Sequence, residues 1–275
     1  MNYRLLFILL FNLLALTADS QVNIWQDEGR RKVELTPYPA DQGMATGTAV
    51  IVCPGGSYFW HDMDAEGHEV GLWLQRHGIS AFVLRYRTAY VPAFVTHYRL
   101  LFRGNRYPDP QDDLLQALRH VRANAGKYGV NPDSIGVMGF SAGGHLVMSS
   151  AELFPKEERP AFIVPVYPVV TMSDDAIVQS RSRRALLGRR WKDPALRDRL
   201  SMERHAGAGM PPVFLVCCTD DPVVDWRNSL VMEEALSAAG VPHECHVFEK
   251  GGHGFGISSG DAPWFPMFLE WFGRL

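Results

Sequence analysis

The sequence has no excess of charge of either sign, no internal repeat, no low-complexity linker and only four cysteines. Its 27 basic and 30 acidic residues leave a net charge of −3, which gives no electrostatic case for binding nucleic acid. With 275 residues and 47% hydrophobic content, the chain has the composition of a globular protein. Its 25 glycines and 18 prolines fit a turn-rich fold that mixes helices and strands.

One hydrophobic run stands near the N-terminus, and it has the pattern of an export signal. Arg4 supplies a basic start, residues 5–16 form an apolar core, and small residues lead to Ser20. That core is too short to span a bilayer comfortably. We expect cleavage after Ser20, a secreted or periplasmic location and no stable membrane insertion, although an uncleaved anchor stays open. Residues 1–20 are thus a predicted signal peptide, and residues 21–275 a predicted single domain.

All four cysteines follow the predicted signal peptide. Export makes disulfides possible. However, Cys53, Cys217 and Cys218 lie at the ends of predicted central strands, where cysteine often serves as a small apolar residue. Adjacent strand residues face opposite ways, so Cys217 and Cys218 cannot both meet one neighbour. We expect buried free thiols, Cys245 included, and the spacing of cysteine and histidine matches no zinc site.

The most informative segment is residues 139–143, which read Gly-Phe-Ser-Ala-Gly and form a G-x-S-x-G pattern. The segment follows an apolar run at residues 135–138 and precedes a helix-forming stretch at residues 144–148. A strand, a sharp turn and a helix are therefore expected in that order. Small flanking residues let a serine at such a corner hold its hydroxyl clear of the backbone. We expect Ser141 to be a nucleophile rather than a simple helix cap.

A nucleophilic serine needs a base and an orienting acid, and both occur downstream in the order Ser, Asp, His. Glycines flank His253, so its loop can carry the imidazole back over the nucleophile. Asp221 follows a predicted strand and precedes a proline, and we prefer it as the acid. Asp220 and Asp225 are expected to cap or solvate the same loop. The expected catalytic residues are thus Ser141, Asp221 and His253.

A second loop with adjacent glycines follows an early predicted strand at residues 48–53 and reads Pro-Gly-Gly-Ser-Tyr over residues 54–58. Acyl transfer needs two or more N–H donors aimed at the oxygen that becomes negative. Ala142 would supply the first donor of this oxyanion hole, and Gly56 or Ser57 the second. The alternative is an ordinary Pro-Gly turn.

Predicted strands alternate with predicted helices along the chain. Beyond those already named, strands are expected at residues 82–87, 161–166, 213–218 and 243–248, and helices at residues 67–77, 111–128, 228–239 and 264–272. This order predicts an α/β fold with a mainly parallel sheet that helices cover on both faces. Right-handed crossovers would bring the loop after Cys53 and the loops with Ser141, Asp221 and His253 to one edge of that sheet.

Several segments together resemble the α/β-hydrolase superfamily, over roughly residues 45–275. They are Pro54-Gly55-Gly56, Glu66-Gly67, residues 82–87, residues 139–145, Asp221-Pro222-Val223-Val224 and residues 252–255. More narrowly, the chain is similar to small secreted carbohydrate esterases of bacteria, the acetylxylan-esterase and feruloyl-esterase-like group. Ser57 stands where these relatives usually have a further glycine, and Asp225 where a proline is frequent. Both departures could alter the acyl pocket or the acid loop.

Two stretches, residues 90–109 and 173–210, are long for loops and are expected to be lid-like insertions. The second is rich in arginine and carries Trp191. Aromatic faces suit sugar rings, and arginines could hold acidic decorations. We expect Tyr58 and Trp191 to bind substrate. A solvated helix face is the alternative for the charged stretch.

The resemblance implies a secreted serine esterase that removes acetyl or other small acyl groups from xylan-type polysaccharides or oligosaccharides. It implies no cofactor and no metal, and the expected partner is a small-molecule or polysaccharide ester rather than nucleic acid. The alternatives are a prolyl-type peptidase, a generic carboxylesterase and a catalytically silent carbohydrate-binding relative. The acyl group, the sugar and the oligomeric state stay open.

Overall fold

The computed structural model describes residues 21–25, 33–41, 43–96, 104–257 and 260–275. The predicted signal peptide lies outside the described residues, so the division of the chain at residue 20 stays a prediction. Within the described ranges, every helix is too short or too polar to cross a membrane.

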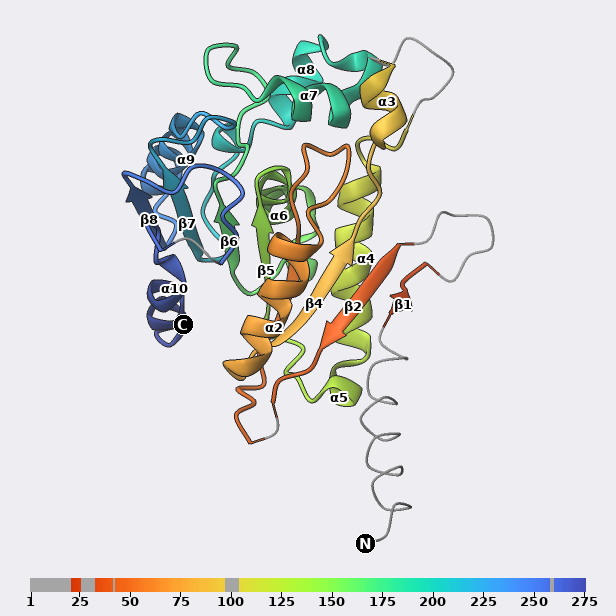
Figure 1. Cartoon of the computed structure of the whole chain (residues 1–275), viewed down its shortest axis with the longest axis vertical. Helices are drawn as coiled ribbons and strands as arrows, with labels where there is room; N and C mark the ends of the chain where they lie inside the picture. Colours follow the sequence, from red (N-terminus) through yellow and green to blue (C-terminus); the bar gives the residue numbers. More distant parts are fainter. Residues whose placement is uncertain (1–20, 26–32, 42, 97–103, 258–259) are drawn as a thin grey trace, which may run out of the picture.

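An eight-stranded sheet forms the centre of the described part (Figure 1). Its strands are β1 (Val22–Asn23), β2 (Glu34–Tyr38), β3 (Ala49–Cys53), β4 (Ser80–Arg85), β5 (Ile135–Phe140), β6 (Ile163–Val166), β7 (Val213–Cys218) and β8 (His243–Phe248). Their order across the sheet is β1-β2-β4-β3-β5-β6-β7-β8, and all pairs from β4 to β8 are parallel. The predicted fold class is confirmed. The strands missing from the prediction, β1 and β2, extend the sheet antiparallel at one edge.

The strands of the parallel part are apolar because both of their faces are covered. In β3, Val50 and Val52 pack in one core cluster, whereas Ile51 and Cys53 pack in another. The pleat of a strand produces this alternation. The sheet therefore separates two hydrophobic cores, one on each face.

Helices cover both faces of the sheet (Figure 1). They are α2 (Glu69–Arg76), α3 (Val91–Val95), α4 (Asp109–Ala123), α5 (Ala125–Tyr128), α6 (Ala142–Leu153), α7 (Ser180–Leu187), α8 (Pro194–Arg199), α9 (Arg227–Ala238) and α10 (Trp264–Phe272), with the short turns η1 (Asp64–His68), η2 (Lys156–Glu158), η3 (Gly188–Arg190) and η4 (Met202–Arg204). Leu118 of α4, Leu146 of α6 and Leu236 of α9 pack in the cluster on one face. Leu74 of α2 and Phe268 of α10 pack in the cluster on the other face.

The carboxyl ends of four parallel strands carry the four loops singled out in the sequence. β3 is followed by residues 54–60, β5 by Ser141, β7 by the loop with Asp221, and β8 by residues 251–256. Open α/β sheets place their ligands at this edge. The sheet thus brings all four loops to one edge, as the crossover rule predicts.

Both long insertions contain helices, and they contact each other. α3 belongs to the first insertion and α7 and α8 to the second, and Figure 1 shows all three beyond the carboxyl ends of the parallel strands. The Arg181 guanidinium lies 5.9 Å from the ring centroid of Phe94. The N–H of Tyr107 donates to the carbonyl of Leu186 at 2.9 Å. The insertions therefore form one assembly beside the edge that carries the four loops.

All four cysteines are free thiols, as expected. Cys53, Cys217 and Cys218 are buried, but the expectation of full burial is wrong for Cys245, which is half-buried at the edge strand β8. Burial raises the pKa of the Cys217 thiol to about 11, which keeps this group protonated at neutral pH.

Candidate active site

Ser141 stands at the corner between β5 and α6 in a backbone conformation that non-glycine residues rarely adopt, with φ 54° and ψ −115°. Small neighbours make this corner possible. A Cβ atom added at Gly139 would lie 2.2 Å from the Gly143 carbonyl oxygen. A Cβ atom added at Gly143 would lie 2.0 Å from the Cys53 carbonyl oxygen. The turn predicted from the G-x-S-x-G pattern is present, and its glycines lie where another backbone segment approaches too closely for a side chain.

The structure brings the three residues expected to be catalytic into one hydrogen-bonded chain. Ser141 Oγ lies 2.9 Å from His253 Nε2, and His253 Nδ1 lies 2.6 Å from Asp221 Oδ2. These distances fit a tautomer in which Nδ1–H donates to the carboxylate and Nε2 accepts from the serine hydroxyl. The side chains of Asp221 and His253 are 2% and 12% exposed, so water competes little for these bonds.

The three aspartates considered for the acid have separate partners. Asp221 also uses Oδ1 to accept from two backbone N–H groups of its own loop, at 2.7 and 2.9 Å, which orients its carboxylate. Asp220 accepts from a backbone N–H of the loop that carries His253, at 2.8 Å. Asp225 pairs with Arg227. Of the three, Asp221 is the one that contacts the imidazole.

The loop after β3 lies directly against the serine corner. A Cβ atom added at Gly55 would lie 2.9 Å from Ser141 Cβ, so glycine is needed for this approach. Gly56 and Ser57 both have positive φ, and their N–H groups have no hydrogen-bond acceptor among the described residues. Ala142 is the first residue of α6, so its N–H group has no acceptor within the helix. The predicted oxyanion donors therefore lie on the two segments that meet at Ser141.

A buried carboxylate without a predicted role joins the loops of the site. Glu66 Oε2 accepts from the Gly55 N–H at 2.6 Å, and Glu66 Oε1 accepts from the Tyr167 hydroxyl at 2.8 Å. The same hydroxyl oxygen accepts from the Gly256 N–H at 3.1 Å. Burial raises the pKa of Glu66, and its hydrogen bonds oppose that rise. One network thus holds the loop after β3, the segment after β6 and the histidine loop.

Tyr167 also supports the imidazole directly. Its ring centroid lies 4.7 Å from that of His253 and 4.5 Å from that of Phe255. Its φ of 37° is outside the usual range for a residue with a side chain. No local sequence pattern marks Tyr167, because its partners come from other parts of the chain. The only signal for Glu66 was its place in a segment that resembles the superfamily.

The two residues expected to bind substrate, Tyr58 and Trp191, have different surroundings. Tyr58 is 1% exposed, and its hydroxyl lies 2.8 Å from His145 Nδ1 in the core. The expectation for Tyr58 is wrong because its side chain packs inward. Trp191 lies among cations, with the Arg184 guanidinium 4.8 Å and the Lys192 ammonium 5.1 Å from its ring centroid. Substrate binding by Trp191 stays a prediction.

The described residues contain no group of three or more His, Cys, Asp or Glu side chains that could hold a metal ion. The prediction that the chain needs no cofactor stays a prediction. The groups that the site offers for chemistry are the Ser141 hydroxyl, the His253 imidazole and the backbone N–H groups beside them.

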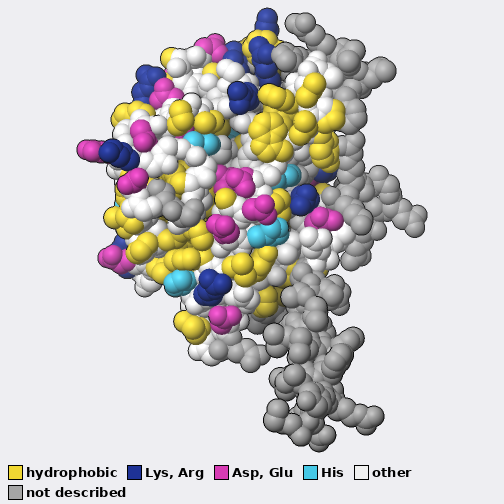
Figure 2. Space-filling model, in the orientation of Figure 1, with side chains coloured by type: hydrophobic (Ala, Val, Ile, Leu, Met, Phe, Trp, Pro, Cys, Tyr) yellow, Lys and Arg dark blue, Asp and Glu magenta, His cyan; other side chains and the backbone are white. Residues whose placement is uncertain are grey.

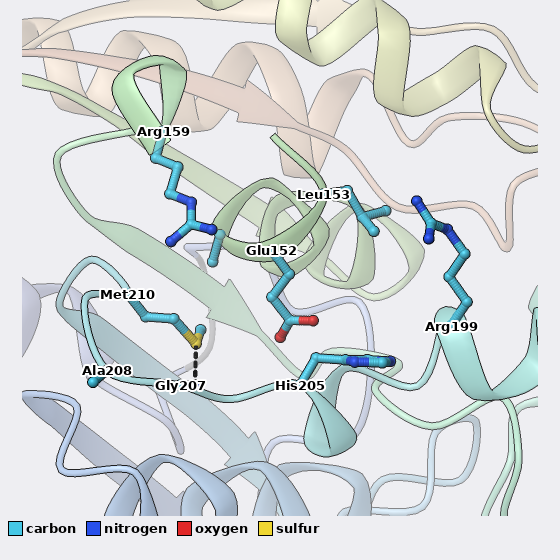
Figure 3. Close-up of a pocket in the computed structure, with 9 residues that line it drawn as sticks. Glu152, Leu153, Arg159, Arg199, His205, Gly207, Ala208 and Met210 are labelled. Atoms are coloured by element: carbon cyan, nitrogen blue, oxygen red, sulfur yellow. Dashed lines mark hydrogen bonds between the residues drawn. The ribbon is translucent and has the colours of Figure 1, made fainter. Parts of the chain in front are cut away.

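A separate cavity of about 380 Å³ lies at the other end of α6 (Figure 3). The serine corner precedes α6 and Glu152 is in its last turn, so helix geometry separates them by roughly 16 Å. Figure 3 shows the Glu152 carboxylate between Arg159 and Arg199, close to His205. Both carboxylate oxygens are buried and have no hydrogen-bond partner among the described residues. Burial, together with the charge of Glu203, raises the pKa of Glu152 to about 8.

Comparison with known proteins relates this chain to hydrolases. A family profile described as an alpha/beta hydrolase fold matches residues 84–257, more than half of the chain. An acetylxylan esterase of Xylanibacter ruminicola is 33% identical over 219 residues, which are 78% of this chain. Endo-1,4-beta-xylanase B of Butyrivibrio fibrisolvens is 29% identical over 235 residues, which are 82% of this chain. The chain spans only 42% and 34% of the lengths of these two relatives.

Among solved structures that match nearly the whole chain, one is also similar in sequence. The acetyl ester-xyloside bifunctional hydrolase of Caldicellulosiruptor lactoaceticus has a TM-score of 0.80 and 33% sequence identity. The match covers 93% of this chain and 96% of that one. The similarity therefore extends beyond the segment that the family profile matches.

The Glu152 carboxyl is expected to make stability depend on pH. Its pKa of about 8 in the folded chain exceeds the ordinary value of 4.5. Between these pH values the folded chain holds a proton that the unfolded chain has lost, so stability falls as pH rises from 4.5 toward 8. We expect Glu152→Gln to raise the free energy of unfolding by roughly 4 kcal/mol at pH 8, with little effect near pH 4.5.

Denaturant unfolding of both proteins across this pH range measures the difference. Glu157→Gln removes an exposed carboxylate five positions away and is the matched control, with a similarly small effect at both pH values. If the stability of Glu152→Gln ran parallel to that of the unaltered chain at all pH values, the account of this carboxyl would be wrong.

Proposed function

This chain belongs to the alpha/beta hydrolase family, and on that premise we propose that it is a serine esterase that removes acetyl or other small acyl groups from xylan-type oligosaccharides or polysaccharides. One observation carries the proposal: the hydrogen-bonded chain from Ser141 Oγ through His253 to Asp221, at 2.9 and 2.6 Å. Such a chain activates a serine hydroxyl for attack on an acyl carbon. A catalytically silent relative would have no need of this geometry.

In the proposed first step, Ser141 Oγ attacks the ester carbonyl carbon while His253 Nε2 takes the hydroxyl proton. Asp221 stabilises the imidazolium that forms. The bond between the acyl carbon and the sugar oxygen then breaks, and the imidazolium gives its proton to that oxygen. Water, deprotonated by the same imidazole, attacks the acyl-serine and releases the carboxylic acid.

The negative oxygen of each tetrahedral intermediate needs N–H donors that are already in place. The N–H groups of Ala142, Gly56 and Ser57 suit this role, because the segments that carry them meet at the serine corner. The N-terminal end of α6 adds a positive partial charge at the same point. In comparable enzymes one such donor lowers the barrier by about 3 kcal/mol.

Two relatives support a xylan-type substrate. They are an acetylxylan esterase and an acetyl ester-xyloside bifunctional hydrolase, and each name combines an acetyl ester with a xylose-based sugar. The second is the stronger support, because it matches almost the whole of both chains, whereas this chain spans less than half of the first. Ser141 itself is buried, and a small acyl group suits such a confined position.

Export is part of the proposal, because residues 5–16 and the small residues before Gln21 have the pattern of a cleaved signal peptide. An exported enzyme can reach polymers that are too large to enter a cell. We expect the mature protein recovered from outside the cytoplasm to begin at Gln21, which N-terminal sequencing measures. A mature protein that still begins at Met1 would contradict cleavage.

The first test of the proposed activity compares the mature chain with its Ser141→Ala variant. We expect the unaltered chain to release acetate from acetylated xylan, and Ser141→Ala to lose about 10⁴- to 10⁶-fold in kcat, because no other group supplies the nucleophile. Acetate release from acetylated xylan and acetylated xylose is measured beside a feruloylated sugar and phenyl acetate. Circular dichroism checks that the variant keeps its fold.

Two other outcomes would each contradict one part of the proposal. If only phenyl acetate is hydrolysed, the proposed serine esterase activity stands but the proposed sugar substrate is wrong, and the protein is a generic carboxylesterase. If no ester is hydrolysed and Ser141→Ala binds xylo-oligosaccharides as well as the unaltered chain does, the protein is a binding relative.

The adjacent aspartates give a matched pair of variants. We expect Asp221→Asn to lower kcat by about 10⁴-fold, because the amide no longer holds the imidazole in the required tautomer. Asp220→Asn keeps an oxygen that can accept from the histidine loop, and it should lower kcat less than about tenfold. Initial rates on phenyl acetate compare the two variants. An equal loss of kcat in the two variants would show that Asp221 is not the residue that orients the imidazole.

A further inference from the structure

A cavity of about 280 Å³ lies beside the loop that follows β3. Its walls include Trp60 and His61 from that loop, Arg85 at the end of β4, and Tyr90 and Val91 at the start of α3. Aromatic faces and a cation thus line one hollow. Its volume is in the range that takes a ligand of roughly one sugar ring.

Two consecutive glycines join this cavity to the proposed catalytic site. A Cβ atom added at Gly55 would lie 2.9 Å from Ser141 Cβ, and one added at Gly56 would lie 2.8 Å from Cδ1 of Trp60. The glycine pair therefore touches the serine corner on one side and the indole on the other. The indole and the serine corner thus contact adjacent residues of one loop.

Hydrogen bonds hold the two walls of the cavity together. The Ala89 N–H donates to the Tyr58 carbonyl at 2.8 Å, and the Thr88 hydroxyl donates to the Phe59 carbonyl at 3.1 Å. Tyr58 and Tyr90 have positive φ values of 60° and 65°. Backbone strain of this kind concentrates at ligand sites, where the surrounding contacts hold it in place. The cavity is therefore built into the fold.

The aromatic side chains at its mouth are exposed. Trp60 is 38% and Phe94 37% exposed, and their rings meet edge to face with centroids 5.6 Å apart. Val91 and Val95 are also exposed. Figure 2 shows hydrophobic side chains gathered on this face of the molecule. A group of large exposed apolar side chains beside a cavity marks an interaction site.

Two polar side chains, Arg85 and His61, also line the cavity. The Arg85 side chain is 48% exposed, and its Nε lies 3.5 Å from Glu34 Oε2, too far for a strong hydrogen bond. His61 Nε2 is buried and has no hydrogen-bond partner among the described residues. Burial and the charge of Arg85 lower the pKa of His61 to about 3, so its ring is uncharged at neutral pH. The N–H groups of Arg85 are thus available to hydroxyl groups.

We propose that this cavity binds a glycosyl unit of the acylated oligosaccharide, an inference that rests on the proposed esterase function. The C–H face of the sugar ring packs on the indole of Trp60, and the Arg85 guanidinium donates to ring hydroxyls. Trp60 then determines which sugar esters are held beside Ser141. The acyl group itself contacts the serine corner and the oxyanion donors, which are the same for every ester.

The test compares a sugar ester with an ester that has no sugar. We expect Trp60→Ala to raise KM for acetylated xylotetraose at least about tenfold, while kcat falls less than about threefold, because the lost surface contacts the sugar and not the acyl group. KM for phenyl acetate should rise less than about threefold. Trp60→Phe keeps an aromatic face and should recover most of the affinity. Met267→Ala, at an exposed residue of α10, is the control and should change neither KM.

A second measurement does not depend on catalysis. Unacetylated xylotetraose is titrated calorimetrically into Ser141→Ala and into the double variant that also carries Trp60→Ala. We expect the affinity to fall at least about tenfold when the indole is removed. Circular dichroism and thermal unfolding confirm that the variants being compared are folded.

These measurements distinguish the failure of one proposal from that of the other. If no ester is hydrolysed but Trp60→Ala weakens the binding of xylotetraose, the esterase function fails and the sugar site stands. If esters are hydrolysed and Trp60→Ala raises KM equally for acetylated xylotetraose and phenyl acetate, the indole only supports the loop after β3, and the proposed sugar site is wrong. If the variant binds xylotetraose as well as its parent does, the sugar site is also wrong.

Discussion

The carboxylate of Glu66 is the contact on which the geometry of the site depends. It is 3% exposed, and its oxygens accept from the Gly55 N–H and the Tyr167 hydroxyl, at 2.6 and 2.8 Å. A buried carboxylate without partners would cost several kcal/mol, so loss of either donor would destabilise the fold. Because Tyr167 also binds the Gly256 N–H and packs on His253, one buried group sets the spacing between the loop after β3 and the loop that carries His253.

Around that carboxylate the backbone is strained. The non-glycine residues with positive φ in the described part are Ser57, Tyr58, Tyr90, Ser141 and Tyr167, and all of them lie in the catalytic site or along the cavity beside it. Each such conformation costs on the order of 1–3 kcal/mol, so it persists only where neighbouring contacts leave no alternative. The two hydrophobic cores and the parallel sheet supply those contacts. The strain is confined to the edge of the sheet where binding and chemistry are proposed, while the rest of the sheet is regular.

The parts of the site that could be predicted from the sequence are those with local signals. Ser141 has glycines on both sides, His253 lies between glycines, and Asp221 follows an apolar run and precedes a proline. The parallel sheet follows from apolar runs that alternate with amphipathic segments. Glu66 and Tyr167 could not be found in this way, because they are 101 positions apart and only the fold brings them together. The edge strands β1 and β2 were missed because β1 has two residues and β2 contains a proline, and neither has the long apolar run of a central strand.

The error at Tyr58 shows why the direction of a side chain in a loop is hard to predict. Tyr58 and Trp60 lie two positions apart, and in an extended strand they would face the same side. Positive φ at Tyr58 breaks that alternation, so Tyr58 packs in the core and Trp60 faces solvent. In the proposed function, this one loop offers backbone N–H groups to the acyl oxygen and the Trp60 side chain to the sugar. The N–H groups are present whatever side chains the loop carries, so a change at Trp60 can alter the choice of sugar without altering the chemistry, whereas a change at Tyr58 disturbs the packing that holds the loop.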